Sequence, residues 1–181
     1  ERYQKLVKRQ SLVSAEQFMD FSSTYFEGNK ASLGALGYSR DSQPGKKQIT
    51  FGISTGINSI PTALTIQKGN LQDKKHMRVM LRTVGKVLEP NSLLIFDCGG
   101  NTKANKKKIR AMGFHYLTLK PKKRSVYKHY LSLFKKGEKQ KIVIGDTEYS
   151  CVKVVDGEEI NYIFYSEKLK KDQLRKKRKK F

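Results

Sequence analysis

The chain has 181 residues, of which 38 are Lys or Arg and 16 are Asp or Glu, so its formal net charge is +22. No apolar run approaches the ~20 residues of a membrane span, and two cysteines without a Cys-x-x-Cys spacing argue against a disulfide framework or a zinc site. The charge excess favours a polyanionic partner, above all nucleic acid, with ribosome-like packing or an acidic membrane surface as alternatives.

The first part of the chain predicts three strands in succession. Residues 1–15 are polar and fit a helix end or a linker, and the stretch EQFMDFSS then places an apolar pair before Asp20. A loop rich in Gly, Ser and Asn follows. Alternating apolar residues in QITFGIST and TALTIQKG predict two further strands that form a hairpin.

Helices and strands then alternate. Apolar residues at three-to-four spacing predict an amphipathic helix closed by Pro90; they are Met77, Met80, Leu81, Val84, Val87 and Leu88. The stretch SLLIFD is a short buried strand, residues 102–112 form a second helix with Asn105, Ile109 and Met112 buried, and FHYLTLK is a fifth strand. Such crossovers favour parallel pairing, which predicts an α/β fold with a mixed five-stranded sheet flanked by helices.

After Pro121 the composition changes. Residues 122–136 are basic and partly helical, and a β-meander follows over residues 137–165, with turns at Gly145-Asp146 and Asp156-Gly157. Residues 166–181 read as a basic helix leading to further chain, because the sequence starts without Met and stops inside a lysine-rich segment. We therefore expect one core over residues 16–136, followed by the meander over residues 137–165.

Two carboxylates end apolar stretches, Asp20 in the first predicted strand and Asp97 in the fourth. If these strands are parallel neighbours, the two acids meet, and a divalent cation between them would relieve their repulsion. Gly99 and Gly100 would allow a phosphate backbone to approach. An Asp after a strand also commonly caps a turn or the next helix, so each acid alone fits either reading.

Five stretches in order resemble DDE-type insertion-sequence transposases of bacteria and archaea; they are FMDFSSTYFEG, LGYSRDSQPGKKQITFGI, IPTALTIQKGNLQD, LLIFDCGGNTKAN and GFHYLTLKPK. The resemblance implies a ribonuclease-H-like core, a β-rich insertion after the fifth strand, and two Mg²⁺ or Mn²⁺ ions held by two Asp and one Glu. It makes Asp20 the first catalytic acid and metal ligand and Asp97 the second. Cys98 replaces the basic residue that usually follows the second acid.

Other acids receive structural roles. Asp41 in the GYSRD loop suits an Asx-turn, and Asp73 suits a helix N-cap. The family's third acid lies in a helix with the order Tyr, Arg, Glu, Lys, and the near-match here is Tyr165, Lys168, Asp172 and Lys179. We expect the true Glu beyond Phe181, so that this fragment alone lacks the third acid, with Asp172 as the in-chain candidate.

Residues 101–130 contain ten Lys and Arg and no acid. Such runs give salt-sensitive binding that is blind to sequence. The DNA contacts that we expect are Lys103, Lys106, Lys107, Arg110, Lys122, Lys123 and Arg124.

The sequence thus predicts a cytoplasmic, nucleoid-associated transposase core. Its partners would be double-stranded DNA, both element ends and target, and no membrane; a homodimer is one arrangement left open. A non-catalytic nucleic-acid-binding module and a nuclease without strand transfer are the alternatives.

Overall fold

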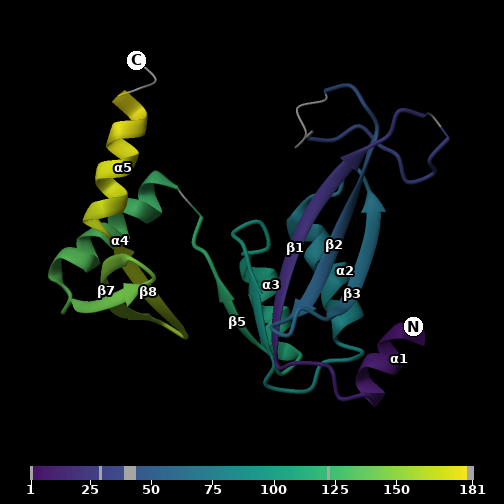
Figure 1. Cartoon of the computed structure of the whole chain (residues 1–181), viewed down its shortest axis with the longest axis horizontal. Helices are drawn as coiled ribbons and strands as arrows, with labels where there is room; N and C mark the ends of the chain where they lie inside the picture. Colours follow the sequence, from purple (N-terminus) through teal and green to yellow (C-terminus); the bar gives the residue numbers. More distant parts are fainter. Residues whose placement is uncertain (1, 29, 39–43, 122, 179–181) are drawn as a thin grey trace. The chain divides into compact units, whose positions relative to one another are not determined.

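The computed structural model describes residues 2–28, 30–38, 44–121 and 123–178 (Figure 1). The chain divides into two compact units, Glu1–Pro121 and Lys122–Phe181, which we call the large unit and the small unit. Among the described residues, no helix is both long and apolar enough to cross a membrane.

The large unit is a mixed sheet with helices, as predicted. Its strand order is β3-β2-β1-β4-β5. The β1–β2 and β2–β3 pairs are antiparallel, whereas β4 is parallel to both β1 and β5. The elements are α1 (Arg2–Arg9), β1 (Glu16–Tyr25), β2 (Gln48–Gly56), β3 (Pro61–Lys68), α2 (Asp73–Val84), β4 (Leu93–Phe96), α3 (Lys103–Ala111) and β5 (His115–Thr118).

The core of the large unit lies between one face of the sheet and helices α2 and α3. Met19 and Phe21 alternate inward from β1, and the apolar stripe of α2 packs on them. Every residue of the predicted stripe is buried, but α2 ends at Val84 rather than near Pro90. Gly85 ends the helix, consistent with its low helix propensity, and its N–H donates to the Leu81 carbonyl at 3.0 Å.

Strand β1 is longer than predicted. It pairs with β2 as far as Tyr25 opposite Gln48, whereas its pairing with β4 stops at Met19 opposite Phe96. Asp20 is therefore inside β1 rather than at its end. The antiparallel partner prolongs the strand after the parallel partner has ended.

The small unit contains the predicted meander. Its antiparallel order is β6-β7-β8, and Gly145 and Gly157 occupy the two turns with φ of +56° and +60°. Such φ values favour glycine because it has no Cβ to clash. The elements are α4 (Arg124–Lys136), β6 (Gln140–Ile144), β7 (Thr147–Asp156), β8 (Glu159–Tyr165) and α5 (Glu167–Arg178).

Helix α4 belongs with this meander rather than with the core, to which we assigned residues up to 136. The Phe134 ring lies 5.8 Å from the Tyr165 ring, between centroids. Gly137 packs so closely on Val152 that a Cβ there would collide with Cγ1. These contacts place the boundary between the units after Pro121.

Candidate functional site

The register of β1 and β4 places Asp20 and Asp97 at neighbouring positions. The strands are adjacent and parallel, with Met19 opposite Phe96, so the next residue along each is an aspartate. Neighbouring strands lie about 4.8 Å apart. Both aspartates are exposed. Asp20 alternates with the buried Met19 and Phe21 along β1, so its side chain is on the opposite face of the strand.

Each carboxylate is oriented by a backbone N–H. Asp20 Oδ1 accepts from the N–H of Phe21 at 2.9 Å, and Asp97 Oδ1 accepts from the N–H of Gly99 at 2.9 Å. The second contact is an Asx-type turn, so the plain structural role expected of an Asp after a strand is present at Asp97.

Polar contacts hold the loop that follows Asp97. Thr118 Oγ1 donates to the Asp97 carbonyl at 2.9 Å, and Asn101 Nδ2 donates to the Leu119 carbonyl at 2.8 Å. Asn105, 1% exposed, donates to the carbonyls of Gly100 at 2.9 Å and Lys74 at 3.0 Å. Burial of Asn105 was predicted, but its anchoring of two segments was not visible in the sequence.

Gly99 and Gly100 pack closely against neighbouring side chains. A Cβ at Gly99 would lie 2.9 Å from Asp73 Oδ2 and 3.1 Å from Asp97 Oδ1. At Gly100 it would lie 3.0 Å from Phe96 Cδ2. The carboxylates of Asp73 and Asp97 therefore both approach Gly99, and a side chain at this position would crowd them.

Asp73 does not have the role we predicted. The N-cap of α2 is Gln72, which makes no side-chain capping bond, and Asp73 is the first residue of the helix. Its carboxylate instead approaches the loop of Asp97. The sequence suggested a cap at Asp73, but the position of the helix start beside the β4–α3 loop depends on the order of the strands in the sheet.

The described residues do not supply a complete set of three acids. Within residues 2–28, 30–38, 44–121 and 123–178, no three His, Cys, Asp or Glu side chains are grouped to hold a metal ion. Asp172 is exposed on α5 of the small unit. Lys179, the last residue of the near-match, and Asp41 lie outside the described residues.

The basic residues predicted to contact DNA differ in exposure. Lys103, Lys107 and Arg110 are exposed on α3, but Lys106 is only 8% exposed, which argues against the DNA contact predicted for it. The Lys106 and Arg110 cations each lie 5.9 Å from the Tyr116 ring centroid. In the small unit Lys123 and Arg124 are exposed, and Lys122 is outside the described residues.

His76 is buried between α2 and the sheet. Its Nε2 lies 2.8 Å from Thr65 Oγ1, and its ring centroid lies 4.9 Å from that of Phe21. Burial lowers the pKa of His76, and the smaller effect of Asp73 raises it. A charged imidazolium is therefore disfavoured here.

No protein-family model matches the sequence, and neither does any curated protein. Similar solved structures include two transposase complexes. The piggyBac transposase synaptic complex with hairpin DNA has a TM-score of 0.49 and 11% identity, covering 84% of this chain and 33% of that chain. The Mos1 transposase paired-end complex with left transposon end has a TM-score of 0.41 and 10% identity, covering 76% of this chain and 52% of that chain.

The chain thus spans about a third of the piggyBac chain and about half of the Mos1 chain. With TM-scores below 0.5 and identities of 11% and 10%, these similarities assign neither a family nor an activity.

Proposed function

We propose that the large unit is the catalytic core of a metal-dependent DNA transposase. It would hydrolyse one DNA strand and then join the freed 3′ hydroxyl to another phosphodiester. The observation that carries the proposal is the parallel register of β1 and β4, which brings Asp20 beside Asp97 although 77 residues separate them in sequence. The ordered sequence motifs and the excess of Lys and Arg support it.

The residues present fit part of a Mg²⁺ or Mn²⁺ site. Carboxylate oxygens are preferred ligands of Mg²⁺, which also keeps waters and takes substrate phosphates. Asp20 and Asp97 each use Oδ1 to accept from a backbone N–H, and the other oxygen of each carboxylate would hold the cation. When bound, such a cation activates the attacking oxygen and stabilises the leaving one.

The remaining groups position DNA. Lys103, Lys107 and Arg110 follow Asp97 on the same loop and helix, where their charges attract the phosphodiester backbone. Asn105 and Thr118 hold the loop, so that the Asp97 carboxylate keeps its orientation while DNA binds.

The test is Mn²⁺ binding and DNA cleavage by Asp20→Asn and Asp97→Asn. We expect each variant to bind Mn²⁺ more weakly and to lose at least about 10²-fold in cleavage rate, the cost typical of removing one preorganised electrostatic group. Asp146→Asn, which removes an exposed turn acid of the small unit, is the charge-matched control. It should change neither the Mn²⁺ affinity nor the cleavage rate. Equal Mn²⁺ affinity in wild type and Asp97→Asn would show that the site assignment is wrong.

One observation favours a second candidate, a non-catalytic nucleic-acid-binding module of the same fold. The described residues contain no group of three possible metal ligands. Such a module would bind DNA with the same salt dependence in wild type and in both Asp variants, and it would cleave nothing. The same assay distinguishes a transposase from a nuclease without strand transfer. Such a nuclease would cut DNA but would not join it to an oligonucleotide that bears a free 3′ hydroxyl.

A further inference from the structure

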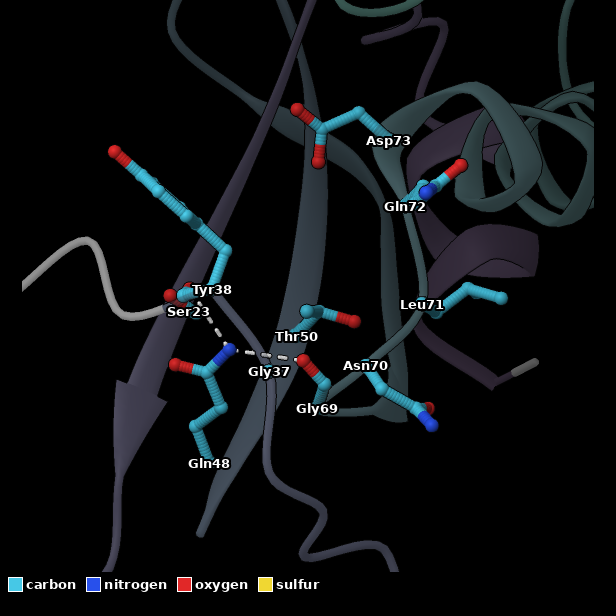
Figure 2. Close-up of a pocket in the computed structure, with 10 residues that line it drawn as sticks. All are labelled: Ser23, Gly37, Tyr38, Gln48, Thr50, Gly69, Asn70, Leu71, Gln72 and Asp73. Atoms are coloured by element: carbon cyan, nitrogen blue, oxygen red, sulfur yellow. Dashed lines mark hydrogen bonds between the residues drawn. The ribbon is translucent and has the colours of Figure 1, made fainter. Parts of the chain in front are cut away.

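A pocket of about 330 Å³ lies in the large unit, where the loop before β2 meets the loop after β3 (Figure 2). Ser23 and Tyr38 are among its lining residues. Gln48 Nε2 joins the two loops by donating to the carbonyls of Tyr38 and Gly69, both at 2.9 Å. Asp73 also lines the pocket and approaches the loop between β4 and α3, so the pocket belongs to the proposed catalytic region. The small unit has a different surface, whose role that region does not explain.

The β-meander of the small unit has two faces, of which α4 covers only one. Directly paired residues of antiparallel strands lie on the same face, and successive residues alternate between faces. Val152 and Tyr165 share one face, where they contact Gly137 and Phe134 at the end of α4. The apolar side chains of the other face, which we call the open face, are between 50% and 69% exposed; they are Ile144, Val155, Ile160, Tyr162 and Phe164.

The open face is almost uncharged, although the small unit has 18 Lys and Arg against 8 Asp and Glu. Of its strand positions, all of which are described, Lys153 is the only charged one. Lys153 is paired with Tyr162, so its carbon stem can lie along the ring while its ammonium group reaches water. A single cation does not provide the row of phosphate contacts that DNA binding uses. An apolar protein surface is therefore a better partner for this face than nucleic acid.

The small unit buries few apolar side chains by itself. Phe134, Cys151 and Val152 are the buried ones among its described residues. Units of this size with so small a core are commonly stabilised by disulfides, a metal or oligomerisation. Its one cysteine, Cys151, is free, and the described residues contain no group of three metal ligands. Burial of the open face against another copy would add the apolar contacts that the unit lacks.

We propose that the open face packs against the open face of a second copy, so that two small units form a two-layer β-sandwich. This inference does not rest on the proposed function. A half-exposed Tyr or Phe leaves about 100 Å² to bury, so five such side chains give roughly 500 Å² per copy and about 1,000 Å² in total. That total reaches the lower limit expected of a specific interface. A two-fold axis lets the same surface serve on both sides.

Charges at the two ends of the meander favour an antiparallel arrangement of the two copies. Residues 156–159, at the β7–β8 turn, include three acids and no Lys or Arg. Residues 167–171, which follow the other end of β8, include three Lys and one Glu. Antiparallel packing brings the acidic end of one copy to the basic end of its partner, whereas parallel packing would bring like charges together.

Sedimentation equilibrium of the full chain without DNA tests the proposal. We expect a species of twice the 20.8 kDa of one chain at a protein concentration of about 100 μM, which dissociates on dilution. Tyr162→Lys places a charge in the middle of β8 on the open face, so it should raise the Kd of dimerisation at least about tenfold. Val143→Lys is the matched control, because Val143 is 68% exposed in the same meander but on the other face. It should dimerise as wild type does.

A second variant and a second measurement separate loss of the interface from loss of the fold. Val155→Lys changes the neighbouring strand of the open face at an exposed side chain, and it should weaken dimerisation as well. In urea titrations followed by backbone amide NMR, the unfolding midpoint of the small unit should rise with protein concentration in wild type. It should not depend on concentration in Tyr162→Lys.

A chain that remains monomeric at about 100 μM would overturn the proposal, because the interface would then be absent. Dimers that persist in both Tyr162→Lys and Val155→Lys would overturn it as well, since they would use another surface. Dissociation of the dimer by Val143→Lys to the same extent as by Tyr162→Lys would likewise refute the assignment to the open face.

Discussion

The two units carry similar charge but differ in how many apolar side chains they bury. The large unit has 20 Lys and Arg against 8 Asp and Glu, and the small unit has 18 against 8. In the large unit a continuous apolar cluster fills the space between sheet and helices. In the described part of the small unit the only buried apolar side chains are Phe134, Cys151 and Val152.

The difference follows from architecture. A sheet covered by two helices buries side chains from five elements, whereas a meander with one packed helix leaves large apolar residues exposed, among them Val155 at 69% and Ile160 at 56%. A unit of roughly 60 residues buries a small share of its surface and is marginally stable. Equal charge therefore does not imply equal stability, and each unit can be disturbed separately.

The largest expected effect is in the small unit. Phe134→Ala removes the ring that packs α4 on β8, and it should destabilise this unit by about 3–5 kcal/mol. That loss is large relative to the stability of so small a unit, so the meander should unfold while the large unit stays folded. Urea titration followed by backbone amide NMR measures the unfolding of each unit separately.

Tyr127→Ala is the matched control on the same helix, because Tyr127 is 66% exposed. It should change the free energy of unfolding by no more than about 0.5 kcal/mol. If Phe134→Ala shifted the transition of both units together, they would form one cooperative domain, and the comparison would fail.

A smaller effect is expected in the large unit on acidification. Because burial lowers the pKa of His76, the unfolded chain takes up a proton near pH 6.5, its ordinary pKa, while the folded chain does not. The free energy of unfolding of the large unit should therefore fall as the pH drops below about 6.5, by at most about 1.4 kcal/mol per pH unit. Above that pH the contribution is constant.

Denaturant titrations from about pH 8 to pH 5 measure this dependence. His76→Gln should lose part of it, and the small unit, whose described residues include no buried histidine, should not show it. A slope identical in wild type and His76→Gln would mean that other groups cause the acid sensitivity.

The smallest effect concerns DNA binding. Changing both Lys103 and Lys107 to Ala should make the plot of log K for DNA binding against log salt concentration less steep, by about 2 in slope. Each lost phosphate contact removes about 0.9 from the magnitude of the negative slope. Lys106→Met should leave the slope unchanged, since Lys106 is buried. Filter binding at several salt concentrations gives the slopes.

The exposed pair Lys135 and Lys136 in the last turn of α4 provides the matching test in the small unit. We expect a smaller decrease in slope when both become Ala. An equal decrease would show that DNA binding is spread over both units according to charge alone.

Local pattern was sufficient for much of the secondary structure. The three-to-four spacing of Met77, Met80 and Leu81 correctly predicted the buried stripe of α2, and Asp156-Gly157 correctly predicted the turn between β7 and β8. Each of these signals consists of residues that lie within a few positions of one another in the sequence. They fail at element ends, as in α2 and β1, where the neighbouring segment decides how far an element continues.

Residue types and short-range spacing were enough to predict the alternation of strands and helices, the charge and the pair of candidate acids. The fold was needed to establish that β1 and β4 are neighbours, that Asp73 approaches Gly99, that Lys106 is buried, and that Ser23 and Tyr38 line one pocket. Strand order and register depend on packing between segments that are far apart in sequence. The side chain beside a given residue therefore follows from the whole sheet rather than from its neighbours in the chain.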